Sequence, residues 1–312
     1  MEVYAGIDLH SSNNYLGIID EQDRRLFKKR LPNELDTVLL ALEPYKKELV
    51  GAVVESTYNW YWLVDGLMDN GYKVHLANPS AIKQYEGLKY IDDKWDSFWL
   101  ARMLRLGILP EGHIYRKQDR PLRDLLRRRL FLVRQRTAHI LSLEGMVNRN
   151  LGVRMSGREI KRLKEEDIEG LFNHPYLVLA ARTNIATIGF LKERIRTIEK
   201  EALCLMRPCH EFTSLQTMPG IGDILALTIM LEVGDMDRFP TVGDYSSYCR
   251  CVKSERLSNG KKKGKGNQKN GNKYLAWAYI EAANFAVRFC PDAQKFYQRK
   301  VAKTNKIVSR QA

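Results

Sequence analysis

Apolar residues in the first third of the chain fall into short runs that alternate with helical patterns. The runs predict strands at residues 3–9, 15–19, 25–30, 49–55 and 72–77. Helical periodicity between and after them predicts helices at residues 33–42, 58–70, 78–87 and 92–104. The run 49–55 is almost purely apolar, as is typical of a strand buried on both faces. Three strands followed by alternating strands and helices predict a mixed α/β sheet.

The middle of the chain has the periodicity of long helices. Apolar positions recur at spacings of three and four in two stretches, residues 122–151 and 177–205, with a polar segment near 155–168 between them. This spacing suits a seam between long helices and predicts an antiparallel hairpin or a coiled coil, which commonly dimerises. The alternative is an ordinary helical subdomain that packs on its own sheet.

The last third begins with two helical patterns separated by Pro219-Gly220-Ile221-Gly222. This arrangement predicts a helix-hairpin-helix element. Gly220 and Gly222 leave room for backbone N–H groups to approach a phosphate, and the following helix N-terminus favours negative charge. The alternative is a helix-linking turn without a ligand. An amphipathic helix at residues 274–289 closes this part, which predicts a mostly α C-terminal region.

A Gly/Asn/Lys segment between residues 249 and 271 lacks the apolar residues of a core. It predicts a flexible, phosphate-binding loop, and the alternative is a solvated run of charge. Its candidate nucleic-acid-binding side chains are Lys261, Lys262, Lys263, Lys265 and Lys269. Together these patterns predict three domains, at residues 1–115, 116–205 and 206–312.

Charge is divided unevenly along the 312 residues, whose net charge is +14. Residues 1–115 carry 13 Lys+Arg and 17 Asp+Glu, giving −4, and the remainder carries 38 and 20, giving +18. A basic half favours a polyanionic partner, and Arg127, Arg128 and Arg129 in its helical part are further candidates for contact with nucleic acid. The five cysteines form no CxxC pair, and the sequence contains no signal peptide or transmembrane run, which predicts a reduced cytoplasmic protein without a membrane partner.

Four acids in the acidic part form a candidate metal site. Asp8 and Glu55 end predicted strands, and Asp93 and Asp96 are three residues apart and therefore share one side of a predicted helix. Carboxylates of this kind could hold two Mg²⁺ or Mn²⁺ ions that are completed by water and substrate phosphates. Asp92 is an alternative to Asp93, and each acid could instead be a surface or capping residue.

The order of these motifs resembles one family. GIDLH, VVES and DKWD followed by SFWLARMLRLGILP are similar to the RuvC-like (RNase H-like) domain of the DEDD insertion-sequence transposases, also called bridge-RNA-guided recombinases. TMPGIGDILALTIMLEVGDMDRF and SERLSNGKKKGKGNQKNGNKYLAWAYIEAA resemble the second domain of that family. The resemblance covers nearly the whole chain. Asp92 and Ser97 stand where the family commonly has Thr and Ala, and the family usually continues into a further helix beyond Ala312.

The resemblance implies a chemistry and partners. It places the family's acidic tetrad on Asp8, Glu55, Asp93 and Asp96, and its nucleophilic serine on Ser258. Ser254 is the nearest alternative, and Ser246 and Ser247 come after it. This serine would attack a DNA phosphate and form a covalent seryl–DNA link, with Mg²⁺ on the same phosphate. The resemblance further implies a structured guide (bridge) RNA that pairs with target and donor DNA.

Three hypotheses of function follow. The first is a prokaryotic transposase or site-specific recombinase that acts at the nucleoid as a dimer or tetramer, with residues 116–205 as the candidate interface. The second is a RuvC-like, metal-dependent junction endonuclease that forms no covalent intermediate. The third is a nucleic-acid-binding protein without catalysis, whose acids are structural.

Overall fold

The computed structural model describes residues 1–82, 93–206, 209–252, 255–265 and 270–303, with the side chains of 93–95, 255–257, 262 and 265 also outside the description. The chain forms two compact units. One comprises Met1–Lys117 with Lys253–Asn270, and the other comprises Gln118–Val252 with Gly271–Ala312. The three-domain division at residues 115 and 205 stays a prediction.

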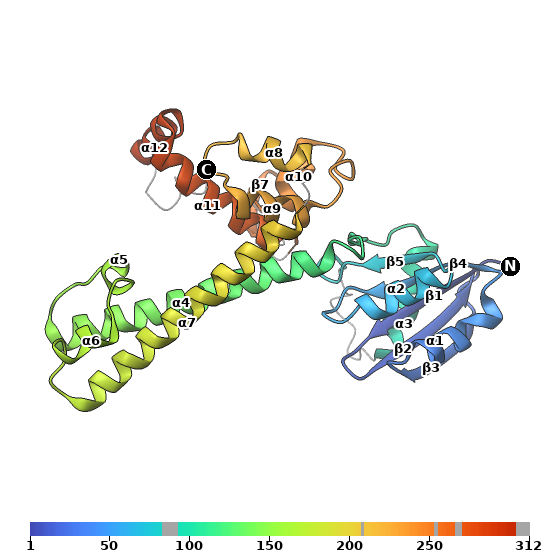
Figure 1. The fold of residues 1–312 in the computed structure, drawn as a ribbon. Helices are drawn as coiled ribbons and strands as arrows, with labels where there is room; N and C mark the ends of the chain where they lie inside the picture. Colours follow the sequence, from blue (N-terminus) through green and yellow to red (C-terminus); the bar gives the residue numbers. More distant parts are fainter. Residues whose placement is uncertain (83–92, 207–208, 253–254, 266–269, 304–312) are drawn as a thin grey trace. The chain divides into compact units, whose positions relative to one another are not determined.

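A five-stranded mixed sheet forms the centre of the first unit (Figure 1). Its strands are β1 (Val3–Leu9), β2 (Asn13–Asp20), β3 (Arg25–Pro32), β4 (Leu49–Glu55) and β5 (Val74–Ala77). Their order in the sheet is β3-β2-β1-β4-β5. The first three pair antiparallel, whereas β1–β4 and β4–β5 pair parallel. The predicted mixed α/β sheet is therefore confirmed.

Helices cover both faces of this sheet. Helices α1 (Leu35–Leu42) and α2 (Tyr61–Asp69) share a buried core with Ala5 and Ile7 of β1. The short helix η1 (Glu43–Tyr45) lies between α1 and β4, and α2 lies between β4 and β5. Helix α3 (Asp93–Arg105) covers the other face, where Phe98 and Ala101 pack against Tyr4. Side chains alternate between faces along a strand, so Tyr4, Gly6 and Asp8 all belong to the face that α3 covers.

The contact between α3 and β1 is unusually close at Gly6. A Cβ atom at Gly6 would lie 1.8 Å from the carbonyl oxygen of Ser97 and 2.8 Å from the amide nitrogen of Ala101. No side chain fits there. The missing side chain of Gly6 thus lets the backbone of α3 rest directly on the strand that carries Asp8.

Two long helices dominate the second unit. Helix α4 (Arg120–Leu151) and helix α7 (Pro175–Leu205) lie side by side and run in opposite directions, joined by the short helices α5 (Gly157–Ile160) and α6 (Glu165–Glu169) (Figure 1). The fully buried side chains of Leu143, Ile160 and Ile168 anchor the turn region in a core of its own. The predicted helical hairpin is present, and its self-association as a coiled coil stays a prediction.

The remaining helices of this unit are α8 (His210–Gln216), α9 (Asp223–Val233), α10 (Val242–Tyr248), α11 (Lys273–Phe289) and α12 (Pro291–Lys303). Most residues of helix α9 are buried, with Leu227 and Ile229 fully so, and the helix packs against α4, α8 and α11. The prediction of a mostly helical region after the sheet is confirmed.

Two predicted elements differ from the structure. Residues 78–82 form a turn rather than the start of a helix, and the rest of the predicted helix lies outside the described residues. The predicted flexible loop contains a β-hairpin made of β6 (Glu255–Ser258) and β7 (Lys261–Lys265). Among the described residues, no helix is both long and apolar enough to cross a membrane.

Candidate functional site

Asp8 and Glu55 are brought together by the register of two parallel strands. Ile7 of β1 pairs with Val54 of β4, so Asp8 and Glu55 follow at the same level near the carboxyl ends of both strands. The Asp8 side chain is close enough to Glu55 to act on its pKa. Glu55 shares its face with Val53, which packs against Leu100 of α3. The pair therefore lies on the sheet face that α3 covers.

Neither carboxyl group of this pair has full access to solvent. Asp8 is buried, with 4% of its surface exposed, and Glu55 is partly buried. Burial, together with the hydrogen bond and the negative charge of Asp8, raises the pKa of Glu55 to about 7, and the nearby His10 opposes this rise. Two carboxylates in such contact need a proton or a cation between them, which is the property of a divalent metal site.

His10 is a member of this cluster that the sequence analysis did not select. Its Nε2 lies 3.1 Å from Oδ2 of Asp8. Its carbonyl oxygen accepts hydrogen bonds from the side-chain amides of Asn33 and Asn59, each at 3.0 Å, which fixes the turn after β1. The sequence could have indicated His10, because it follows Asp8 by two positions and side chains at that spacing point to the same side of an extended chain.

The other two predicted metal ligands lie on α3, which crosses the same face. Asp96 is partly buried and immediately precedes Ser97, the residue that contacts Gly6. The backbone of Asp93 begins α3, but its side chain lies outside the described residues, as does all of Asp92. Within the described part of the chain, no three His, Cys, Asp or Glu side chains converge as a metal-binding group.

Helix α3 is held in place from its other end. Asp23, in the turn between β2 and β3, accepts hydrogen bonds from Arg102 and Arg105 at 2.7–2.9 Å. These arginines hold the pKa of Asp23 below its usual value despite partial burial. The ion pairs thus fix the helix on which Asp93 and Asp96 are carried.

Ser258 is exposed at the end of β6, next to a tight turn. Asn259 and Gly260 both have positive φ, at 50° and 70°, as in the type I′ turn of a two-residue hairpin. Ser258 pairs with Lys261 across this turn, and the side chains of Lys261 and Lys263 are exposed. The side chains of Lys262 and Lys265, and all of Lys269 and Ser254, lie outside the described residues. The Asn-Gly dipeptide was the sequence signal for this hairpin.

The glycines of the segment between α8 and α9 have different environments from those predicted. A Cβ atom at Gly220 would lie 2.1 Å from the carbonyl oxygen of Ala282 in α11, so the packing of the helices by itself requires glycine there. Gly222 is exposed with open space around it, and it precedes the first residue of α9. The Asp223 carboxylate occupies the first turn of α9 and would oppose an anion there. The helix-hairpin-helix role stays a prediction.

The three predicted arginines of α4 also differ from one another. Arg127 forms an ion pair with buried Glu232, and Arg129 forms one with Glu199. A phosphate would have to compete with these internal partners. Arg128 is exposed and lies over the ring of Phe131, so it is the member of the three whose environment suits contact with nucleic acid.

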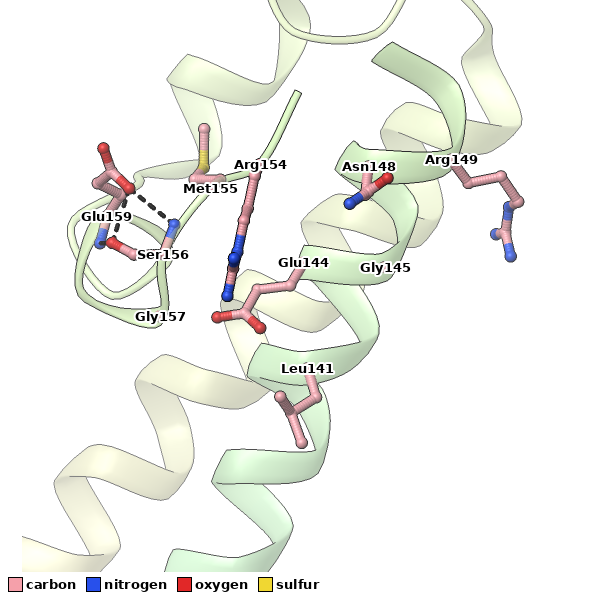
Figure 2. Close-up of a pocket in the computed structure, with 10 residues that line it drawn as sticks. All are labelled: Leu141, Glu144, Gly145, Asn148, Arg149, Arg154, Met155, Ser156, Gly157 and Glu159. Atoms are coloured by element: carbon pink, nitrogen blue, oxygen red, sulfur yellow. Dashed lines mark hydrogen bonds between the residues drawn. The ribbon is translucent and has the colours of Figure 1, made fainter. Parts of the chain in front are cut away.

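A cavity of about 670 Å³ lies elsewhere, between α4 and the segment that leads into α5. Figure 2 shows Arg154 extended toward the Glu144 carboxylate, Arg149 directed away, and Ser156 hydrogen-bonded to Glu159. Two arginines and two glutamates balance its charge. This balance does not favour a phosphate, and none of the predicted site residues lines the cavity.

Comparisons with known proteins place this arrangement among the transposases. A DEDD transposase family model of the IS110 type matches residues 5–150, and a model described as the transposase IS116/IS110/IS902 family matches residues 213–298. The chain is thus similar to IS110-type transposases in two separate regions. These matches confirm the resemblance predicted from the motifs.

Similar proteins carry the same description at low sequence identity. A putative transposase of Sinorhizobium fredii is 24% identical over 81% of this chain, which spans 60% of that protein's length. The transposase for insertion sequence element IS1328 of Yersinia enterocolitica is 23% identical over 89% of this chain and 82% of its own. The transposase for insertion sequence element IS1111A of Coxiella burnetii is 24% identical over 91% of this chain and 77% of its own length.

Proposed function

We propose that this protein cuts and rejoins DNA as the transposase of an insertion sequence, through a covalent seryl–DNA intermediate. The observation that carries the proposal is the position of Asp8 beside Glu55 on adjacent parallel strands, within a region that a DEDD transposase family model matches. We assign the divalent metal, Mg²⁺ or Mn²⁺, to Asp8, Glu55, Asp93 and Asp96. Once bound, this metal supplies positive charge that stabilises the reacting phosphate.

Ser258 is the proposed nucleophile. Its hydroxyl oxygen forms a bond to phosphorus as the bond from phosphorus to a deoxyribose oxygen breaks, and the departing oxygen takes up a proton. The serine proton passes to water or a carboxylate, so the step needs no oxidant or reductant. The exposed position of Ser258 beside Lys261 supports this role, because the hydroxyl is accessible and a cation lies near the developing negative charge.

We assign the contacts to DNA and to a structured guide RNA to the basic part of the chain. The exposed cations Arg128, Lys261 and Lys263 support this assignment, since phosphate contacts supply most of the sequence-independent affinity. Base pairing with the RNA would choose the target and donor sequences. The long helices α4 and α7 expose Phe131, Leu179 and Phe190, which supports self-association along this hairpin.

Trapping of a protein–DNA adduct tests the proposal. The full chain is incubated with its RNA, element-end DNA and Mg²⁺, then denatured and separated by electrophoresis. We expect a denaturation-resistant adduct that is absent in Ser258→Ala, while Ser258→Ala still binds DNA. Ser246→Ala serves as the control and should form the adduct normally.

Two outcomes would contradict the proposal in different ways. Metal-dependent cleavage without an adduct, unchanged in Ser258→Ala, would make the protein a RuvC-like endonuclease. Nucleic-acid binding with no cleavage in Mg²⁺ or Mn²⁺ would leave the acids with a structural role.

A further inference from the structure

A buried carboxylate joins three helices of the second unit close to the point where the serine-bearing segment leaves and returns. Glu232 of α9 has 1% of its surface exposed. Its Oε2 lies 3.0 Å from Nε of Arg123 and 2.8 Å from Nη2 of Arg127, both on α4. Burial alone would raise the pKa of Glu232, but the hydrogen bonds and charges of the two arginines hold it below its usual value.

The third partner of Glu232 is the residue that caps α11. Asn272 donates from Nδ2 to Oε2 of Glu232 at 2.7 Å. Its Oδ1 accepts hydrogen bonds from the backbone N–H groups of Tyr274 and Leu275, at 2.8 and 3.2 Å, so the same side chain starts α11. Asn272 is itself buried, at 7% exposure. One amide therefore fixes the first turn of α11 to a charge held by α4 and α9.

Asn272 also closes the chain on the residues just before the hairpin. Its backbone N–H donates to the carbonyl oxygen of Tyr248 at 2.6 Å. Arg250 donates from Nη2 to the carbonyl oxygen of Gly271 at 2.9 Å. Gly271 has φ of +83°, and a Cβ atom there would lie 2.6 Å from the oxygen of Tyr248. Residues 248–250 and 271–272 are thus held together, and we call these contacts the base of the segment that contains Ser258.

We propose that Glu232 and Asn272 are positioning residues, which act through this base to fix the segment that carries Ser258. The inference rests on the proposed role of Ser258. A buried ion pair is weak evidence for stability alone, because removing charges from water costs about as much as the pairing returns. Its geometric effect is more specific: a hydrogen-bonded carboxylate fixes Asn272 in one orientation, and Asn272 fixes the ends of the segment. We therefore expect the network to govern the rate of the chemical step rather than DNA affinity.

Three variants separate this role from stability. Asn272→Ser keeps a good helix cap but cannot reach Glu232. Glu232→Gln keeps the shape but removes the charge that pairs with Arg123 and Arg127. In the double variant Glu232→Gln with Asn272→Asp, the glutamine amide can donate to the aspartate, which reverses the direction of the original hydrogen bond. The net charge of the cluster is unchanged. Glu199→Gln is the matched control, since Glu199 pairs with Arg129 between α4 and α7 without contacting this base.

Two measurements are made on the full chain. Amide hydrogen exchange of Asn272, Tyr274 and Leu275 reports on the base and needs no activity. Single-turnover adduct formation with saturating DNA reports on positioning. For the two single variants we expect about tenfold faster exchange and about tenfold slower adduct formation, the effect of losing one charge-assisted hydrogen bond. DNA affinity should be unchanged, the double variant should recover, and Glu199→Gln should match the wild type.

The outcomes are distinguishable. Unchanged exchange in both single variants overturns the proposed base. Faster exchange with normal adduct formation overturns the positioning role and leaves a structural one. A wild-type protein that forms no adduct contradicts the proposed function, and the positioning role fails with it.

Discussion

Asp8 and Glu55 lie beside each other near the ends of two parallel strands, on the face covered by α3. Burial, together with the neighbouring Asp8 carboxyl group, raises the pKa of Glu55 to about 7. Either a proton or a cation therefore satisfies this pair near neutral pH. Because either a proton or a cation can satisfy the pair, the stability of the protein should depend on both pH and metal, and the site can be tested through stability as well as through activity.

The stability of the metal-free protein should fall as the pH rises. The pKa of Glu55 is about 7 in the folded protein, against an ordinary value of 4.5, so the folded state binds the proton more tightly than the unfolded state. This contribution is complete below pH 4.5 and is lost as the pH rises through about 7. Urea unfolding in a metal chelator between pH 5 and 8 measures it. In Glu55→Gln this decline should disappear, and an unchanged decline would show that another group causes it.

A divalent metal should oppose this decline. Bound Mg²⁺ or Mn²⁺ favours the ionised pair, so added metal should raise the melting temperature more at pH 8 than at pH 5.5. Thermal unfolding with and without metal, at fixed ionic strength, gives the difference. Ca²⁺ at the same concentration tests for selectivity, and Glu43→Gln on the same unit is the control for general charge effects. An equal rise at both pH values would contradict a metal at Asp8 and Glu55.

Neutral substitution in the pair should separate stability from activity. Asp8→Asn and Glu55→Gln each remove one of two like charges, so the metal-free protein should be at least as stable as the wild type at pH 8. DNA cleavage in Mg²⁺ should fall on the order of 100-fold or more, as when a preorganised electrostatic partner is removed. Melting curves and cleavage rates on the same preparations decide this. A stable variant with normal cleavage would exclude both acids from the site.

Nucleic-acid binding should depend on salt through the exposed lysines. Each phosphate contact contributes about 0.9 to the slope of log affinity against log salt for duplex DNA. Replacing Lys261 and Lys263 with Gln should therefore lower the slope by up to about 1.8. Arg129→Gln is the matched control, because Arg129 is paired with Glu199, and it should leave the slope unchanged. A slope that falls equally in both variants would place the phosphate contacts elsewhere.

The strands and the long helices could be predicted because their apolar patterns are strong. The predicted bounds of β1 and β4, residues 3–9 and 49–55, match the structure. Asp8 and Glu55 could be selected because each sits at or near the end of such a strand. Their contact depends on the parallel pairing of β1 with β4, which a pattern along one strand does not specify.

Contacts between residues far apart in sequence, and the hairpin around Ser258, could not be predicted from local patterns. Arg127 pairs with Glu232, which is more than 100 positions away, so the basic run alone could not predict this ion pair. The hairpin around Ser258 is rich in Lys and Gly and lacks an apolar face, so the Asn-Gly turn was its main signal. Gly220 was assigned to phosphate contact because its neighbour α11 is distant in sequence.

Alanine substitution at the two glycines before α9 tests whether Gly220 serves helix packing or phosphate contact. At Gly220 the new Cβ would lie 2.1 Å from the oxygen of Ala282, and φ is +89°, so both packing and backbone oppose it. We expect Gly220→Ala to lower the free energy of unfolding by about 3 kcal/mol. Gly222→Ala meets open space at an ordinary φ of −96° and should change it by less than about 0.5 kcal/mol. Urea unfolding of the full chain compares the two, with DNA affinity measured at a temperature where both are folded. If Gly220→Ala were as stable as Gly222→Ala but bound DNA more weakly, Gly220 would belong to a phosphate site after all.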